Sequence, residues 1–154
     1  MEIFDILTPD SVLTAVKATS KKHFLQELAK RTADLTGLNE HVIFNVLIER
    51  ERLGTTGVGR GVAIPHGKLF ELDRLRGVFA TLEQPIEFDA LDDQPVDLIF
   101  LLLAPESAGG DHLKALARVS RLLSDSGFCA RLRATKDAAK LYAVLTAGAT
   151  PHAA

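Results

Sequence analysis

His66 occupies a position that presents its side chain. It follows the short apolar run at 61–65 and stands between Pro65 and Gly67. Because a residue that precedes proline is restricted to extended backbone, Ile64 should continue a strand, and His66 should lie at the end of that strand. Gly67 has no side chain that could shield the imidazole. A neutral imidazole, whose usual pKa is about 6.5, is nucleophilic near neutral pH, so His66 could accept an electrophilic group. The alternative is a loop histidine without a chemical role.

Three glycines precede this histidine at alternating positions, namely Gly57, Gly59 and Gly61. Glycine lets backbone N–H groups approach an anion closely, so the segment favours an anionic group near the histidine. It is not a phosphate loop of the nucleotide-binding type, because no Gly-Lys-Ser or Gly-Lys-Thr follows.

Arg50 belongs to a predicted helix that begins at the cap residue Asn39 and ends at Gly54. Helical spacing places Arg50 on an apolar face, where a guanidinium needs a partner. The apolar residues of that face are Val42, Ile43, Val46, Leu47 and Leu53. Two interpretations stay open: Arg50 binds an anion, or it extends past the apolar surface to water at the end of the helix. The neighbouring charges should be solvated, and these are Glu49, Glu51 and Arg52.

His112 lies in the first turn of a helix predicted over 110–125. It shares a face with Leu116, Val119 and Leu123, at spacings of four, seven and eleven residues, so it should point inward. The preceding segment, 96–105, is an apolar run typical of a strand buried on both faces. Sites in α/β sheets gather at the carboxyl ends of strands, and helix N-termini favour anions. The alternative is a core histidine.

Other groups give weaker signals. Asp92, Asp93 and Asp97 could form an acid–base pair or bind a metal, but a solvated turn is the better interpretation. Two histidines without a patterned carboxylate give little support for zinc. No Gly-x-Ser-x-Gly motif occurs, and Cys129 has no motif around it.

The predicted elements place helices on both sides of a block of strands. Helices are predicted over 20–37, 39–54, 110–125 and 134–148, and strands over 61–66, 76–83 and 96–105. The segment 83–97 should be a hairpin-like excursion. We expect an α/β three-layer sandwich with a mixed central β-sheet. We also expect one domain over 1–148 and a flexible tail over 149–154, with His152 on the surface of the tail.

Composition excludes several classes of protein. The chain has 154 residues and a formal net charge of −2, which argues against a general nucleic-acid binder. Its single cysteine cannot form an internal disulfide, which suits a reducing cytosol. The first twenty residues lack a signal pattern, and the run at 98–104 is too short to cross a bilayer. We expect a cytoplasmic protein that does not insert into membranes.

Three segments resemble the enzyme IIA domains of the bacterial phosphotransferase system. They are "RERLGTTGVGRGVAIPHGKL" at 50–69, "IEFDALDDQPVDLIFLLLAP" at 86–105 and "HLKALARVSRLL" at 112–123. The resemblance is to the fructose–mannitol branch (EIIA type 2) and, within it, to the nitrogen-regulatory IIA proteins, and it covers nearly the whole chain. Arg60 departs from the subgroup, in which we associate this position with a small polar residue.

The resemblance implies roles for individual residues. His66 would take a phosphoryl group on Nε2 from a small histidine phosphocarrier protein of the HPr or NPr kind. Arg50 would steady that group, and His112 would lie beside the reactive imidazole. Thr56, Gly57, Gly59, Gly61 and Gly67 would bind phosphate or shape the site. Transfer between histidines depends on positioning and charge, so no metal or cofactor is expected.

The implied function is that of a nitrogen-regulatory phosphocarrier, a component of a phosphotransferase system rather than a stand-alone enzyme. Its targets would be cytoplasmic or membrane-associated, and in this subgroup they include potassium-transport and sensor kinase proteins. One alternative is a sugar-transport IIA that passes phosphate to a separate permease domain. Others are a binding module with structural histidines and a zinc hydrolase.

Overall fold

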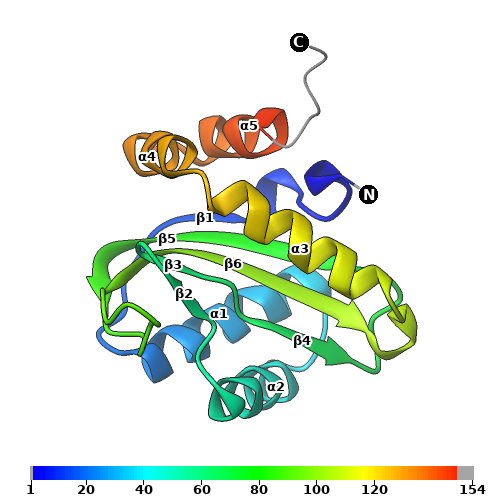
Figure 1. The fold of residues 1–154 in the computed structure, drawn as a ribbon. Helices are drawn as coiled ribbons and strands as arrows, with labels where there is room; N and C mark the ends of the chain where they lie inside the picture. The colour runs from blue at the N-terminus through cyan, green and yellow to red at the C-terminus, as the bar shows by residue number, and fades with distance from the viewer. Residues whose placement is uncertain (1, 149–154) are drawn as a thin grey trace.

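The computed structural model describes residues 2–148, which form three layers (Figure 1). A six-stranded mixed sheet lies between α1 and α2 on one face and α3, α4 and α5 on the other. The predicted α/β sandwich is therefore confirmed. The predicted flexible tail, with His152, lies outside the described residues. No helix within 2–148 is both long and apolar enough to cross a membrane.

Strand β6 (Val96–Pro105) is the centre of the sheet and is almost entirely buried, as its apolar sequence predicts. It pairs antiparallel with β5 (Arg76–Ile86) and parallel with both β3 (Val62–Ala63) and β4 (His66–Leu69). Two strands that the sequence analysis did not predict complete the sheet. They are β1 (Val12–Val16), parallel to β5, and β2 (Gly57–Gly59), antiparallel to β3.

Pro65 divides the strand that was predicted over 61–66. Proline has no N–H to donate to the ladder, so β3 ends before it. Its carbonyl still accepts from the Leu102 N–H at 2.9 Å, and pairing with β6 resumes at His66, opposite Leu102. His66 therefore begins β4 and does not end a strand, which corrects the prediction.

The two helices on one face have the predicted ends. Helix α1 (Lys21–Thr36) starts after Ser20, whose hydroxyl accepts from the His23 N–H, and stops at Gly37 with φ 77°. Helix α2 (Glu40–Leu53) starts after Asn39, which accepts two backbone N–H groups, and stops at Gly54. Both pack on the sheet through fully buried side chains, which include Phe24, Leu28, Ile43 and Leu47.

The other face carries α3 (Asp111–Leu123), α4 (Ser126–Ala134) and α5 (Ala138–Gly148). Helix α4 was not predicted, because it is only nine residues long and follows α3 after a two-residue break. The side chain of Asp125 caps α4 by accepting from the Phe128 N–H at 3.0 Å. Three short 3₁₀ helices complete the fold at Ile3–Asp5, Pro9–Ser11 and Glu106–Ala108.

Candidate functional site

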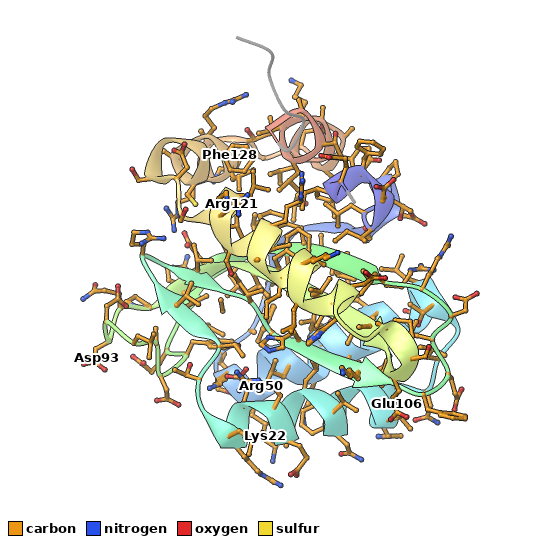
Figure 2. The ribbon with its side chains drawn as sticks, turned by 45° about the vertical axis from the view of Figure 1, so that its right-hand side comes forward. Lys22, Arg50, Asp93, Glu106, Arg121 and Phe128 are labelled. Atoms are coloured by element: carbon orange, nitrogen blue, oxygen red, sulfur yellow. The ribbon has the colours of Figure 1, made fainter. Side chains whose placement is uncertain are left out.

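Three elements bring the predicted site residues together. Strand β4 begins with His66, the last turn of α2 carries Arg50, and the first turn of α3 carries His112. Arg50 Nε lies 3.2 Å from His66 Nε2, and the ring centroids of the two histidines are 6.1 Å apart. Figure 2 shows Arg50 beside β4. Residues separated by up to 62 positions in sequence thus meet at one end of β4.

The hydrogen bonds of His66 fix its tautomer. His66 Nδ1 lies 2.9 Å from the carbonyl oxygen of Ile64, and a carbonyl can only accept, so Nδ1 carries the ring proton. Nε2 then keeps its lone pair, which accepts the N–H of Arg50. The nitrogen that faces Arg50 is therefore the nucleophilic one.

Arg50 is half-buried and has no carboxylate partner among the ion pairs of residues 2–148. Its second hydrogen bond runs from Nη1 to the Gly54 carbonyl at 2.9 Å. The apolar face predicted around it is only partly correct. Val42 and Leu53 are 47% and 85% exposed, because at 3.6 residues per turn both side chains point roughly 100° or more away from the buried pair Ile43 and Leu47.

His112 is partly buried, and its Nδ1 is a buried atom without a hydrogen-bond partner in the described part of the chain. Burial lowers the pKa of His112 below its usual 6.5, and repulsion from Lys68 and from His66 adds to the effect. The neutral imidazole is therefore favoured beside His66.

Thr56 is buried, and its donors are used within the protein. Its N–H donates to Glu51 Oε1 at 3.0 Å, and its hydroxyl donates to the other carboxylate oxygen of Glu51. Glu51 was predicted to be solvated, and that prediction is wrong, because its side chain is only 5% exposed and pairs with Lys21 Nζ at 2.9 Å. Glu49 and Arg52 form an exposed pair, as predicted.

Gly67 allows α2 to approach β4. A Cβ at this position would overlap Val46 Cγ1. Residues 66 and 67 face opposite sides of the strand, so Gly67 serves helix packing and does not control access to the imidazole. At the three glycines that precede His66 a Cβ would also meet protein atoms: Gly57 faces Ala90, Gly59 faces Asp92, and Gly61 faces Arg133 and Asp97.

The acidic residues after β5 hold a turn. Asp92 accepts from the N–H groups of Arg60 and Gln94 at 2.8 and 3.1 Å, and these bonds keep the pKa of its carboxyl below the usual value. Asp97 departs from the predicted solvated turn, because it pairs with Arg133 at 3.0 Å. Within residues 2–148, no group of three His, Cys, Asp or Glu side chains could hold a metal ion.

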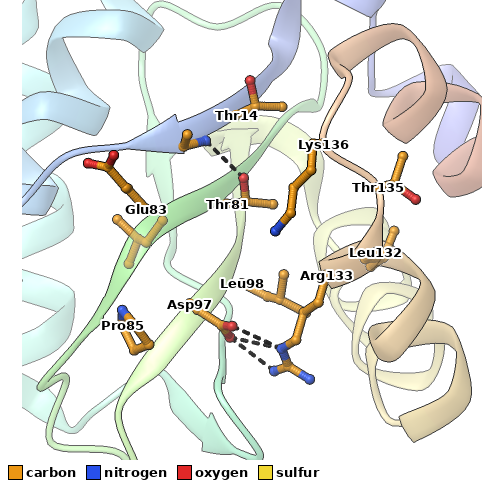
Figure 3. A pocket seen from close by; sticks show the side chains of 12 residues that line it. Thr14, Thr81, Glu83, Pro85, Asp97, Leu98, Leu132, Arg133, Thr135 and Lys136 are labelled. Carbon is orange, nitrogen blue, oxygen red and sulfur yellow. Dashed lines mark hydrogen bonds and ion pairs between the residues drawn. The ribbon is translucent and has the colours of Figure 1, made fainter.

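A hollow of about 270 Å³ lies elsewhere, between β1, β5, the start of β6 and the segment that joins α4 to α5 (Figure 3). Arg133 lines it while bound to Asp97, and the Thr81 hydroxyl accepts from the Ala15 N–H at 3.0 Å. Lys136 extends into it (Figure 3). None of the residues predicted to accept or bind phosphate lines this hollow.

Comparison with known proteins identifies the family. The model of the phosphoenolpyruvate-dependent sugar phosphotransferase system, EIIA 2, matches residues 5–148. The chain belongs to this family. The EIIA chain is 58% identical over 145 residues to a nitrogen regulatory protein of Bradyrhizobium diazoefficiens, covering 94% of this chain and 95% of that protein. It is 42% identical over 148 residues to the nitrogen regulatory protein of Escherichia coli K12, covering 95% and 90%.

Solved structures agree with this assignment. The crystal structure of the nitrogen regulatory protein IIA-Ntr from Neisseria meningitidis matches with a TM-score of 0.88 and 35% identity, covering 94% of this chain and 99% of that one. Mannitol IIA from Escherichia coli shares the fold, with a TM-score of 0.75 and 20% identity, covering 90% and 98%. The predicted resemblance to the nitrogen-regulatory EIIA branch is confirmed.

The sequence analysis missed two parts of the site: the Ile64 carbonyl that sets the tautomer of His66, and the buried carboxylate of Glu51. A signal for Glu51 existed. An acidic residue in the last turn of a helix opposes the helix dipole, so a stabilising partner elsewhere was to be expected.

Proposed function

We propose that this EIIA protein accepts a phosphoryl group on Nε2 of His66. The observation that carries the proposal is the pair of hydrogen bonds on the imidazole. The Ile64 carbonyl holds the proton on Nδ1, so the lone pair of Nε2 faces a guanidinium that has no carboxylate partner within residues 2–148. The nucleophilic nitrogen of His66 and the guanidinium of Arg50, which can bind the incoming phosphoryl oxygens, thus lie side by side.

The transfer is an exchange between two nitrogens. The lone pair of His66 Nε2 forms a bond to phosphorus while the phosphorus–nitrogen bond of the donor breaks, and that electron pair returns to the donor imidazole. Arg50 then donates to a phosphoryl oxygen instead of to Nε2, and the Ile64 carbonyl stabilises the charge that develops on the ring. Neutral His112 can donate a hydrogen bond from the side of α3 without adding a competing positive charge.

Exposed apolar residues that neighbour the site residues in sequence favour a protein as donor. Leu53 is 85% exposed, Phe70 82% and Leu113 62%. They lie three residues after Arg50, four after His66 and one after His112 in the chain. Exposed apolar side chains of this size suit a contact surface that another protein covers. The donor in this proposal is a histidine phosphocarrier protein of the HPr or NPr kind, encountered in the cytoplasm.

We further propose that the protein acts as a regulator. Phosphorylation places about two negative charges on an imidazole that was neutral, and burying an unpaired charge under a partner is costly. Targets that dock over His66, such as potassium-transport or sensor kinase proteins, should distinguish the two forms. The similarity to nitrogen regulatory proteins supports this role.

Phosphate labelling tests the acceptor. Incubation with phosphoenolpyruvate, its phosphotransferase and the phosphocarrier should add one phosphate that is stable in alkali and labile in acid. His66→Ala should take up none, and His112→Ala should still be labelled. Normal labelling of the His66→Ala protein would refute the proposal.

A second candidate function is sugar transport, which the family description and the fold shared with mannitol IIA both support. The test adds membranes that contain a fructose- or mannitol-type permease to the labelled protein. Efficient phosphorylation of sugar, together with identical sets of captured proteins for the two forms, would make this chain a transport component. A regulator should show no sugar phosphate and at least one target that prefers one form.

A further inference from the structure

We infer that Glu51 is a positioning residue that keeps the His66 imidazole in its reactive tautomer and orientation. Glu51 does not touch His66, and it acts through the turn at 54–56. The inference rests on the proposed role of His66 as the phosphoryl acceptor. It extends that role to a residue that the sequence analysis interpreted as a solvated charge.

The carboxylate of Glu51 is the centre of a buried polar cluster. Its side chain is 5% exposed and receives Lys21 Nζ at 2.9 Å and the Thr56 N–H at 3.0 Å, as well as the Thr56 hydroxyl. Lys21 is held in turn, because its ammonium lies 4.7 Å from the centre of the Phe88 ring and 3.9 Å from Asp89. Glu51 therefore joins the start of α1, the end of α2 and the turn that follows α2.

One chain of hydrogen bonds runs from this cluster to Nδ1 of His66. The carboxylate of Glu51 fixes Thr56, and the carbonyl of Thr56 accepts from the Ile64 N–H at 3.0 Å. The carbonyl of the same Ile64 residue accepts from His66 Nδ1 at 2.9 Å. The group that selects the tautomer is thus anchored through Thr56.

A second chain runs to Nε2. The Gly54 carbonyl accepts from Arg50 Nη1 at 2.9 Å, while Arg50 Nε donates to His66 Nε2 at 3.2 Å. The Gly54 N–H donates to the backbone carbonyl of Glu51 at 3.1 Å. The turn that supports the guanidinium is therefore pinned at both ends by Glu51, through its backbone at Gly54 and through its side chain at Thr56.

Loss of the charge should loosen both chains at once. Lys21 would keep a mostly buried ammonium without its nearest carboxylate, and Thr56 would lose part of its acceptor set. The turn would relax, and the Ile64 carbonyl and Arg50 would no longer hold the imidazole from opposite sides. The reactive nitrogen would then sample the wrong tautomer and the wrong direction.

The test compares Glu51→Gln with Glu49→Gln, a matched change on the same helix at a side chain that is 66% exposed. Nitrogen-15 NMR of the His66 ring reports the tautomer, single-turnover labelling by the phosphocarrier reports transfer, and thermal unfolding reports the fold. We expect wild type and Glu49→Gln to show the Nδ1–H form. Glu51→Gln should show a mixed tautomer and transfer slowed about 10-fold to 100-fold while the protein stays folded.

The outcomes separate this inference from the proposed function. If wild type accepts no phosphate on His66, the proposed function fails, yet the tautomer comparison still decides the role of Glu51. A Glu51→Gln protein with the wild-type tautomer and transfer rate would overturn the inference. If Glu51→Gln does not fold, Thr56→Val decides in its place: it removes only the hydroxyl contact, and a tautomer and rate unchanged from wild type would overturn the inference equally.

Discussion

Two arginines beside the same glycine-rich segment differ in what their charge meets. Arg50 donates to a neutral imidazole and to a carbonyl. Arg133 binds both oxygens of Asp97 at 3.0 to 3.1 Å and donates to the Arg60 carbonyl at 2.8 Å. The charge of Arg133 is therefore neutralised within the protein, whereas that of Arg50 is available to a new anion. A free charge beside a nucleophile is what distinguishes the proposed functional end of the sheet.

The two regions also differ in whether their polar groups already have partners. The hollow of about 270 Å³ lies at Arg133, where the arginine and the Thr81 hydroxyl already have partners in the fold. The region of His66 has polar groups that could form further hydrogen bonds, including the buried Nδ1 of His112, which has no partner within residues 2–148. A small-molecule enzyme would use an enclosed cavity, but a protein that receives phosphate from another protein needs an accessible nucleophile. The hollow at Arg133 is therefore not the candidate site.

Exchanging each arginine for lysine should separate the two regions most sharply. Arg50→Lys keeps a positive charge but loses the forked geometry, and we expect transfer to His66 to slow about 100-fold with little change in the free energy of unfolding. Arg133→Lys should transfer at the wild-type rate and lose about 1 kcal/mol of stability. Single-turnover labelling and urea unfolding measure the two effects. Equal slowing by both exchanges would remove the distinction between a free and a neutralised arginine.

His112 should have the next largest effect on transfer. His112→Asn removes a group that can contact the phosphoryl oxygens, so we expect transfer about 10-fold slower, with phosphate still on His66.

The His112 imidazole should also make the stability of the fold depend on pH. Because the pKa of His112 is lowered in the folded state from its usual 6.5, the unfolded chain takes up the proton first as pH falls. Wild-type stability should therefore decrease as pH drops below about 6.5, towards the lower pKa of the folded state.

The pH dependence has a direct control. The free energy of unfolding of His112→Asn should fall less over this window, and the two proteins should run parallel above it. Urea unfolding from pH 5 to 8 measures the difference, and an NMR titration of the His112 ring gives its pKa. Parallel curves throughout, or phosphate found on His112, would contradict the assignment.

The sequence predicted the parts of the site that local pattern encodes. His66 stands between proline and glycine, and the ends of α2 follow from Asn39 and Gly54, so the place of Arg50 in the last turn of that helix follows from the sequence alone. The position of Glu51 in the last turn of α2 indicates a stabilising partner, but the identity of that partner, Lys21, could not be predicted, because it lies 30 residues earlier on another helix. Strand β2 was missed because its sequence is Gly-Val-Gly, and glycine has little intrinsic preference for strands.

Gly67 allows a test of how closely α2 must approach β4. A Cβ at Gly67 would overlap Val46 Cγ1, so Gly67→Ala should cost about 1–3 kcal/mol of stability and slow transfer by a few-fold as Arg50 moves away. Val46→Ala in the same chain removes the overlapping methyl and should restore part of both losses. Neither variant should alter the pairing of Arg133 with Asp97, which lies in the other region. A double variant no better than Gly67→Ala would show that the two residues act independently.

The smallest expected difference concerns two exposed lysines, one in each region. Lys68 follows His66 by two residues on the same face of β4, and its charge reaches His112. Lys136 lines the hollow near Arg133 (Figure 3), and no ion pair among the described residues includes it.

Lys68→Ala should slow transfer about threefold at low ionic strength, because the site then attracts a phosphorylated donor less strongly, and the effect should vanish near about 1 M salt. Lys136→Ala should change neither transfer nor stability by more than about 0.5 kcal/mol. Slower transfer in Lys136→Ala, with Lys68→Ala unaffected, would place the docking surface of the donor at the opposite end of the sheet.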